Sequence, residues 1–123
     1  MFSINEDQSI YLTRGDSVSL EISATMSDTG MYMFKPGDVI RFQIFEKGRC
    51  DNVVLSKDVT VNAETSIVNV PLHSSETRLG ELIHKPKDYW YEVELNPDTE
   101  PQTIIGYDTS GPKVFRLFPE GGA

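Results

Sequence analysis

The chain has 123 residues, of which 38% are hydrophobic and 24% are charged, and this balance indicates one globular domain rather than a disordered chain. Its apolar runs are far shorter than the roughly 20 residues needed to cross a bilayer as a helix. The chain has 19 Asp and Glu residues against 11 Lys and Arg residues, a net charge of −8, which disfavours nucleic acid and anionic membranes as partners because phosphate binding depends on clustered basic residues.

The predicted elements are strands, because apolar and polar side chains alternate with period two along much of the chain. Strand-like segments occur, in chain order, at 17–24, 38–46, 53–62, 67–72, 89–95, 103–107 and 113–118. In the segment 38–46, one side carries Ile40, Phe42 and Ile44. In the segment 53–62, the same spacing predicts that Val53 and Leu55 share a face.

Residues typical of turns separate these segments, as in Lys35-Pro36-Gly37-Asp38. Helix is expected only as one short turn near 74–80, with Ser74 as its cap and Gly80 at its end. The pattern predicts an all-β antiparallel sandwich of about seven or eight strands, or a barrel, as a single domain over 1–118. The tail 119–123 is expected to fray.

The sequence carries little that indicates catalysis. Cys50 is the single cysteine, so an internal disulfide or a multi-thiolate metal site is excluded, and its polar surroundings favour an incidental loop thiol. The two histidines, His73 and His84, accompany no nucleophile motif and have no zinc-ligand spacing. We therefore predict a non-enzymatic protein with no catalytic residue, metal or cofactor.

A predicted outer strand face combines an aromatic residue with two acids. Trp90, Glu92 and Glu94 alternate with the apolar residues of the segment 89–95. Paired carboxylates serve glycoside hydrolysis in some enzymes, but here they are expected to keep an outer face charged and soluble. Trp90 is the aromatic residue on that face and is a candidate contact for a sugar or a protein.

The tripeptide Arg14-Gly15-Asp16 matches the motif that integrins bind on extracellular proteins. That function requires secretion, whereas the N-terminal segment has neither the basic nor the apolar region of a signal peptide. We expect instead a tight turn in which Gly15 bends the chain before the strand that begins at Ser17. Synthesis and residence in a cytoplasm follow as the expectation.

The order of these pieces resembles a known family. The matching stretches are Leu12 to Ser17, Pro36 to Phe42, Leu79-Gly80, Tyr89 to Leu95, Pro101 to Asp108 and Gly111 to Gly121. Together they look like a family of small proteins from prophages of gut Firmicutes, found among tail and baseplate genes. They are also loosely similar to the N-terminal immunoglobulin-like domain of phage baseplate upper proteins.

The resemblance covers nearly the whole chain and implies an immunoglobulin-like β-sandwich, with a jelly-roll or an open barrel as the alternative fold. It supplies no active site. The family usually runs from Leu-x-x-Gly directly into the Tyr strand, whereas this chain inserts the charged segment 81–88. That loop is a candidate for what is specific to this protein.

The resemblance implies a structural or adaptor protein of a phage tail or baseplate, made in the bacterial cytoplasm and then carried in the virion. Its partners would be other tail or baseplate proteins, or further copies of itself. The candidate interface is the apolar run Met31, Tyr32, Met33 and Phe34, together with Trp90. The alternative for that run is a short strand with Tyr32 and Phe34 in the core.

A second hypothesis of a different class is a carbohydrate-binding module that contacts sugars of the host cell wall. The aromatic residues proposed for it are Trp90, Tyr107 and Tyr11.

Overall fold

The computed structural model describes residues 2–5, 7–26, 30–47, 51–106 and 111–120. Eleven strands and one short helix occur in these ranges. In chain order the elements are β1 (Phe2–Ile4), β2 (Ile10–Thr13), β3 (Val18–Ile22), β4 (Thr25–Met26), β5 (Gly30–Met31), β6 (Val39–Lys47), β7 (Asp51–Thr60), β8 (Val68–Leu72), α1 (Ser74–Thr77), β9 (Lys87–Leu95), β10 (Gln102–Ile105) and β11 (Lys113–Phe118). The predicted segment 113–118 matches β11, and β6, β8 and β9 lie within two residues of their predicted bounds.

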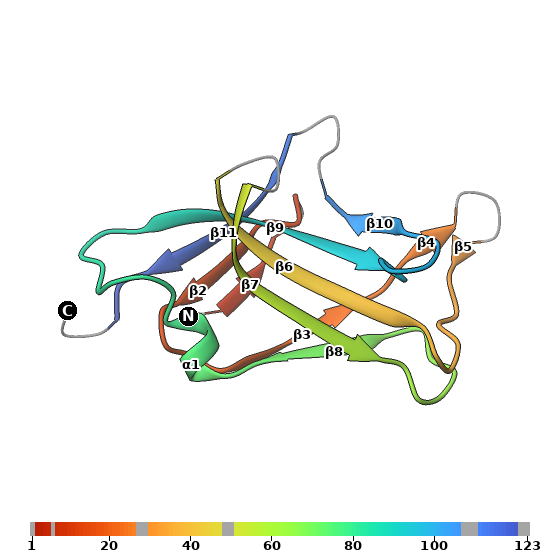
Figure 1. The fold of residues 1–123 in the computed structure, drawn as a ribbon. Helices are drawn as coiled ribbons and strands as arrows, with labels where there is room; N and C mark the ends of the chain where they lie inside the picture. Colours follow the sequence, from red (N-terminus) through yellow and green to blue (C-terminus); the bar gives the residue numbers. More distant parts are fainter. Residues whose placement is uncertain (1, 6, 27–29, 48–50, 107–110, 121–123) are drawn as a thin grey trace.

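Nine of these strands form two packed layers, so the predicted all-β sandwich is confirmed (Figure 1), and β4 pairs separately with β5. A seven-stranded sheet has the order β1-β2-β11-β9-β6-β7, with β10 beside β9, and it faces the two-stranded sheet β3–β8. The order β11-β9-β6-β7 opposite β3 and β8 is that of an immunoglobulin-like sandwich. The large sheet ends in the open edges β1 and β7 rather than closing into a barrel.

One pairing differs from the predicted antiparallel arrangement. Strand β11 pairs with β2 in parallel, with Phe115 opposite Ile10 and Phe118 opposite Thr13. Period-two alternation carries no information on strand direction, and two strands from opposite ends of a chain need no short connection. On its other side β11 pairs antiparallel with β9, and β10 continues that same edge of β9 from Val93 to Leu95.

The core lies between the layers and consists of the inward-facing residues of each long strand. Ile40, Phe42 and Ile44 of β6 are fully buried there, as the alternation predicted. The predicted alignment of Val53 with Leu55 is wrong, because the pairing of β6 with β7 shifts between Ile44 and Phe45. This irregularity adds one residue to β7 and moves Val53 to the outer face, opposite Phe45.

The two-stranded layer covers the wider sheet incompletely. At one edge, Phe2 and Ile4 pair with the core residues Leu12 and Ile10, so they share the inner face, yet both are exposed. At the other edge, Lys57 of β7 donates to the Glu76 carboxylate of α1 at 2.6 Å. Helix α1 thereby closes the margin of the core beside β7.

Helix α1 begins one residue earlier than predicted, with His73 rather than Ser74 as its N-cap. The cause is Glu76, whose carboxylate accepts a hydrogen bond from the His73 amide at 2.8 Å while also binding Lys57. The Thr77 hydroxyl donates to the Asp16 carbonyl at 2.8 Å and accepts from the Gly15 amide at 3.1 Å. These bonds fasten the helix to the turn between β2 and β3.

Arg14 fills the end of the inner face next to this turn and is only 9% exposed. Its guanidinium donates to the carbonyls of Leu79 and Gly80 at 3.2 and 2.8 Å and to the Glu120 carboxylate at 2.6 Å. Gly15 has a φ of +89°, as the predicted turn requires. The tripeptide is therefore a structural turn with its arginine inside the protein.

The contact with Arg14 also bears on the prediction that the tail 119–123 frays, because Glu120 belongs to that tail. Glu120 is held by Arg14, so the chain is ordered by a specific ion pair beyond the end of β11. Residues 121–123 lie outside the described residues, as do Cys50 and Tyr107. Within the described ranges, no helix is long and apolar enough to cross a membrane.

We expect Arg14→Ala to lower the free energy of unfolding by about 1–3 kcal/mol, because buried carbonyl groups lose their donors. Urea denaturation followed by tryptophan fluorescence measures the change. Arg41→Ala is the matched control: Arg41 pairs with the exposed Asp58 and Asp98, so its loss should cost less than about 1 kcal/mol. Equal costs for the two variants would contradict the structural role of Arg14.

Candidate functional site

The apolar run 31–34 is divided between the surface and the interior. Met31 and Met33 are 59% and 44% exposed, whereas Phe34 is fully buried and Tyr32 packs against the core. The Tyr32 amide donates to the Ala24 carbonyl at 2.8 Å, and Phe34 forms a bridge with Thr65. Tyr32 and Phe34 thus have the core positions of the alternative hypothesis, and Met31 and Met33 remain candidates for an interface.

Trp90 lies in an apolar row on the outer face of the seven-stranded sheet. Strand register places Val114 on one side of Trp90 and Phe45 on the other, with Val53 beyond Phe45. Directly paired residues share a face, so these four side chains cross β11, β9, β6 and β7 on the side away from β3 and β8. We call Val53, Phe45, Trp90 and Val114 the outer row.

Phe45 shows how closely the outer row packs. It is only 3% exposed, yet it does not belong to the hydrophobic cluster between the two layers. Its neighbours in the row, Trp90 and Val114, are half-buried, while Val53 at the sheet edge is 48% exposed. The outer face therefore has a small apolar centre of its own, in which Phe45 is buried while Trp90, Val114 and Val53 are partly exposed to solvent.

Charged side chains flank the outer row. On one side, Arg116 binds Asp88 with a shortest contact of 2.6 Å. On the other side lie Glu92 and Glu94, and beyond them Arg41 binds Asp58 at 2.8 Å and Asp98 at 3.1 Å. The carboxylates outnumber the guanidinium groups, so the surroundings of the row are polar and acidic.

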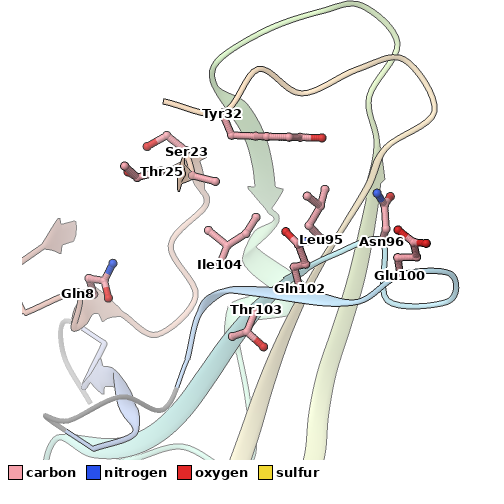
Figure 2. A pocket seen from close by; sticks show the side chains of 11 residues that line it. Gln8, Ser23, Thr25, Tyr32, Leu95, Asn96, Glu100, Gln102, Thr103 and Ile104 are labelled. Atoms are coloured by element: carbon pink, nitrogen blue, oxygen red, sulfur yellow. The ribbon is translucent and has the colours of Figure 1, made fainter. Parts of the chain in front are cut away.

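A cleft of about 410 Å³ opens between the β3–β4 region and β10 (Figure 2). In Figure 1, β4 and β10 lie at the end of the sandwich opposite α1. Neutral polar side chains make up much of its lining: Gln8, Ser23, Thr25, Asn96, Gln102 and Thr103. Its apolar walls are Ala24, Leu95 and Ile104, and Glu100 is the one carboxylate among the lining residues that lie in the described ranges. Tyr32 supplies an aromatic wall.

The Tyr32 ring is held from two sides. Its edge-to-face contact with Phe34 has a centroid distance of 5.1 Å and an interplanar angle of 83°. Its hydroxyl donates to the Asp38 carboxylate at 2.9 Å. Burial, together with this hydrogen bond, raises the pKa of Tyr32, so the phenol stays protonated as a donor.

Asp38 joins two walls of the cleft. Besides Tyr32, its carboxylate accepts from the Asn96 amide group at 3.2 Å and from the Lys35 backbone amide at 3.0 Å. Asn96 in turn accepts from the Val39 amide at 2.9 Å through its side chain. The loop before β6 and the loop after β9 are thereby fixed to each other through one hydrogen-bond network, which is partly exposed.

The same bonds control the ionisation of Asp38. Burial alone would raise the pKa of this carboxyl, but the hydrogen bonds from Lys35, Asn96 and Tyr32 outweigh it and lower the pKa below the usual value. Asp38 is therefore ionised at neutral pH. Its position in the turn follows from Gly37, whose φ of +95° suits the predicted Pro-Gly turn.

The remaining predicted site residues do not converge. His73 is the N-cap of α1, and His84 lies in the segment between α1 and β9. Both are exposed, and neither lines the cleft. The Tyr11 ring packs against Phe118 and under the Arg116 guanidinium, and the strand β11 separates it from Trp90. Among the described residues, no three His, Cys, Asp or Glu side chains gather as a metal site would require.

The inserted segment 81–88 follows α1, and its last two residues are the first two of β9. Its Leu82 side chain is 54% exposed, while Ile83 packs against the core. Residues 83–87 line a shallow, mostly apolar hollow. The segment therefore combines an anchor in the core with an exposed apolar residue.

Comparisons of the chain with protein-family models, with curated proteins and with solved structures find no match.

Sequence reasoning missed most of the cleft. Ser23, Asn96 and Gln102 looked like ordinary turn and strand-end residues, because nothing local indicates that segments so distant in the chain meet. One signal was available in the turn 35–38, where an Asp after Pro-Gly is placed to accept hydrogen bonds from its own loop.

We expect Asp38→Asn to lower the free energy of unfolding by about 1–2 kcal/mol at neutral pH, because charge-assisted hydrogen bonds are replaced by weaker ones. The folded-state pKa of Asp38 lies below its unfolded value of about 3.9. The stabilisation is therefore complete above that pH and is lost as the pH falls further.

Urea denaturation between about pH 7 and pH 3 should show the stabilities of the wild type and Asp38→Asn converging on acidification. The control is Asp98→Asn, which removes a carboxylate that is 75% exposed. A stability gap for Asp38→Asn that stays constant down to the lowest pH would show that the ionised carboxylate contributes nothing.

Proposed function

We propose that this chain is a non-catalytic adaptor domain that docks to another protein through the outer row, with Trp90 at the centre of the contact. The observation that carries the proposal is the separate apolar centre on a solvent-facing sheet surface, where Phe45 is buried outside the core and Trp90 lies beside it. The setting that we propose is a phage tail or baseplate, with assembly in the bacterial cytoplasm before incorporation into the virion.

The outer row has the composition of a protein interface. Interface centres are enriched in aromatic residues and depleted in charged ones, and they are surrounded by a polar rim. Trp90 and Phe45 supply the aromatic centre, and the ion pairs of Arg116 and Arg41 lie in the rim. On an outward-facing sheet surface that binds no partner, polar residues would ordinarily occupy these positions.

The negative charge of this chain decides between two kinds of partner, a second copy of the chain and a different protein. The chain carries a net charge of −8, and the carboxylates near the row include Glu92 and Glu94. Two copies of such a face repel each other, whereas a partner with Lys and Arg around an apolar centre is attracted and oriented. We therefore propose a different protein as the partner, and the same charge argues against nucleic acid.

The phage setting rests on the resemblance of the sequence to tail and baseplate proteins. The absence of catalysis is proposed because the histidines lie on exposed surface, and because Asp38 is engaged in holding loops together. Met31 and Met33 form a second exposed apolar pair at the cleft end of the molecule, and they are the competing docking surface.

We expect Val53→Lys to weaken docking by at least about tenfold, because it buries an unpaired cation at the edge of the interface. Val53 is exposed on the edge strand β7, so the fold tolerates the change. The measurement is light scattering on a sizing column, with the chain alone and mixed with each tail and baseplate protein encoded beside it, at low and high salt.

The matched control is Ile67→Lys, which adds the same charge at an apolar residue of similar exposure, 43%, just before β8. Ser substitutions at Met31 and Met33 test the competing surface. A complex that forms with Val53→Lys but not with the Met substitutions would show that Met31 and Met33, rather than the outer row, form the interface. A homo-oligomer through the outer row, or the lack of any complex, would overturn the proposed partner.

A further inference from the structure

We propose that the cleft between the β3–β4 region and β10 binds an uncharged saccharide. This site is distinct from the outer row and uses none of the aromatic residues first considered for sugar binding. The proposal rests on four properties of the cleft: its hydrogen-bonding groups, its fixed aromatic wall, its charge and its shape.

The lining offers hydrogen-bond donors and acceptors of the kinds that hydroxyl groups require. Gln102 carries an amide group with donor and acceptor atoms, and Ser23, Thr25 and Thr103 carry hydroxyls that act as either. Asn96 uses one donor on Asp38 and one acceptor site on the Val39 amide, so its amide group has one further site of each kind. A sugar hydroxyl likewise donates one bond and accepts others, so a wall of neutral side chains of both kinds matches it. A purely apolar ligand would leave these groups without partners and would bind poorly.

Tyr32 provides a flat surface next to these groups. Figure 2 shows its ring edge-on beside the space between Ile104 and Asn96, with its hydroxyl directed to the Asn96 side. The apolar C–H face of a pyranose packs on an aromatic ring while its hydroxyls point sideways to polar groups. Phe34 and Asp38 hold Tyr32 in place before any ligand arrives, which reduces the ordering cost of binding.

The charge of the cleft selects against anionic ligands. Among the lining residues that the structure describes, Glu100 is the one carboxylate, and none is a Lys, Arg or His. A phosphate, sulfate or uronate group would meet a negative charge with no cation to offset it. The ligand class is therefore a neutral sugar rather than a phosphorylated polymer or a nucleotide.

The volume of the cleft and the number of carboxyl groups in its lining indicate that it binds a saccharide without hydrolysing it. A volume of about 410 Å³ falls at the small end of the range of about 300–1,000 Å³ that is usual for ligand pockets. Glycoside hydrolysis normally uses two carboxyl groups on either side of the scissile bond, whereas the described part of the lining supplies one, that of Glu100. The cleft accordingly suits a short saccharide or the end of a glycan chain.

The test titrates the full chain with chitotriose, cellotriose, maltotriose and mannotriose, each up to about 10 mM, which is well above the Kd of a weak complex. Backbone amide shifts in heteronuclear NMR locate the site. We expect at least one of these neutral trisaccharides to shift the amides of Asn96, Gln102 and Thr103. Trigalacturonate serves as the anionic comparison and should leave them unchanged.

The variant for this test combines Thr25→Ala with Gln102→Ala, which removes two exposed side chains of the lining. We expect its Kd to rise at least about tenfold, because two hydrogen bonds are lost. The matched control combines Thr60→Ala with Gln43→Ala, the same two residue types on β7 and β6, and its Kd should stay within about twofold.

A further arm distinguishes a free sugar from a surface-bound glycan. Retention of the chain on insoluble chitin or cellulose, lost in the cleft variant, indicates a glycan at a surface, and trisaccharide binding without retention indicates a free sugar or a chain end. No shift in the cleft with any neutral trisaccharide would overturn the proposal, as would equal losses in the variant and its control. The docking test with Val53→Lys is independent of either result.

Discussion

The structure depends on an unequal pairing of layers, in which two strands cover a sheet of seven. Strands β3 and β8 bury the centre of the wide sheet, but they cannot reach its margins. Long side chains close those margins, since an alkyl stem packs on apolar surface while its charged head finds a partner. Arg14 reaches the carbonyls before the 81–88 segment, and Lys57 reaches Glu76 of α1. Where no such closure exists, as at Phe2 and Ile4, apolar surface stays exposed.

The end of the sandwich opposite α1 is closed differently, by polar bonds between loops. The Asp38 carboxylate accepts hydrogen bonds from both Tyr32 and Asn96, so it links the loops that carry them and fixes the distance between these loops. A cleft persists there because the contacts that order the loops lie behind its walls and leave the side chains at its mouth unpacked. Asp38 is half-buried, and several charge-assisted hydrogen bonds offset the cost of partly removing its carboxylate from water. A preformed hollow is the consequence, since rigid walls do not have to be ordered by a ligand.

Sequence reasoning predicted what depends on local pattern. The alternation in β6 and β9 marked their inner faces correctly, because a strand's two faces follow from the spacing of its own residues. The parallel pairing of β2 with β11 depends on contacts between the two ends of the chain. The outer row depends on register, and the irregularity after Ile44 that moves Val53 into it has no local signature. The cleft unites residues from four separated segments, and no motif in any one of them indicates the others.

The two proposed binding surfaces differ in how they are held. The outer row is built on paired strands, so its side chains keep their spacing through backbone hydrogen bonds on both sides of Trp90. The cleft depends on loops, which one ionised carboxylate positions. Acidification that protonates Asp38 therefore acts on the cleft through its walls, while the outer row keeps its geometry. A ligand of the cleft and a partner at the outer row can occupy the protein together, because the row faces away from the core and the cleft opens at the end of the layers.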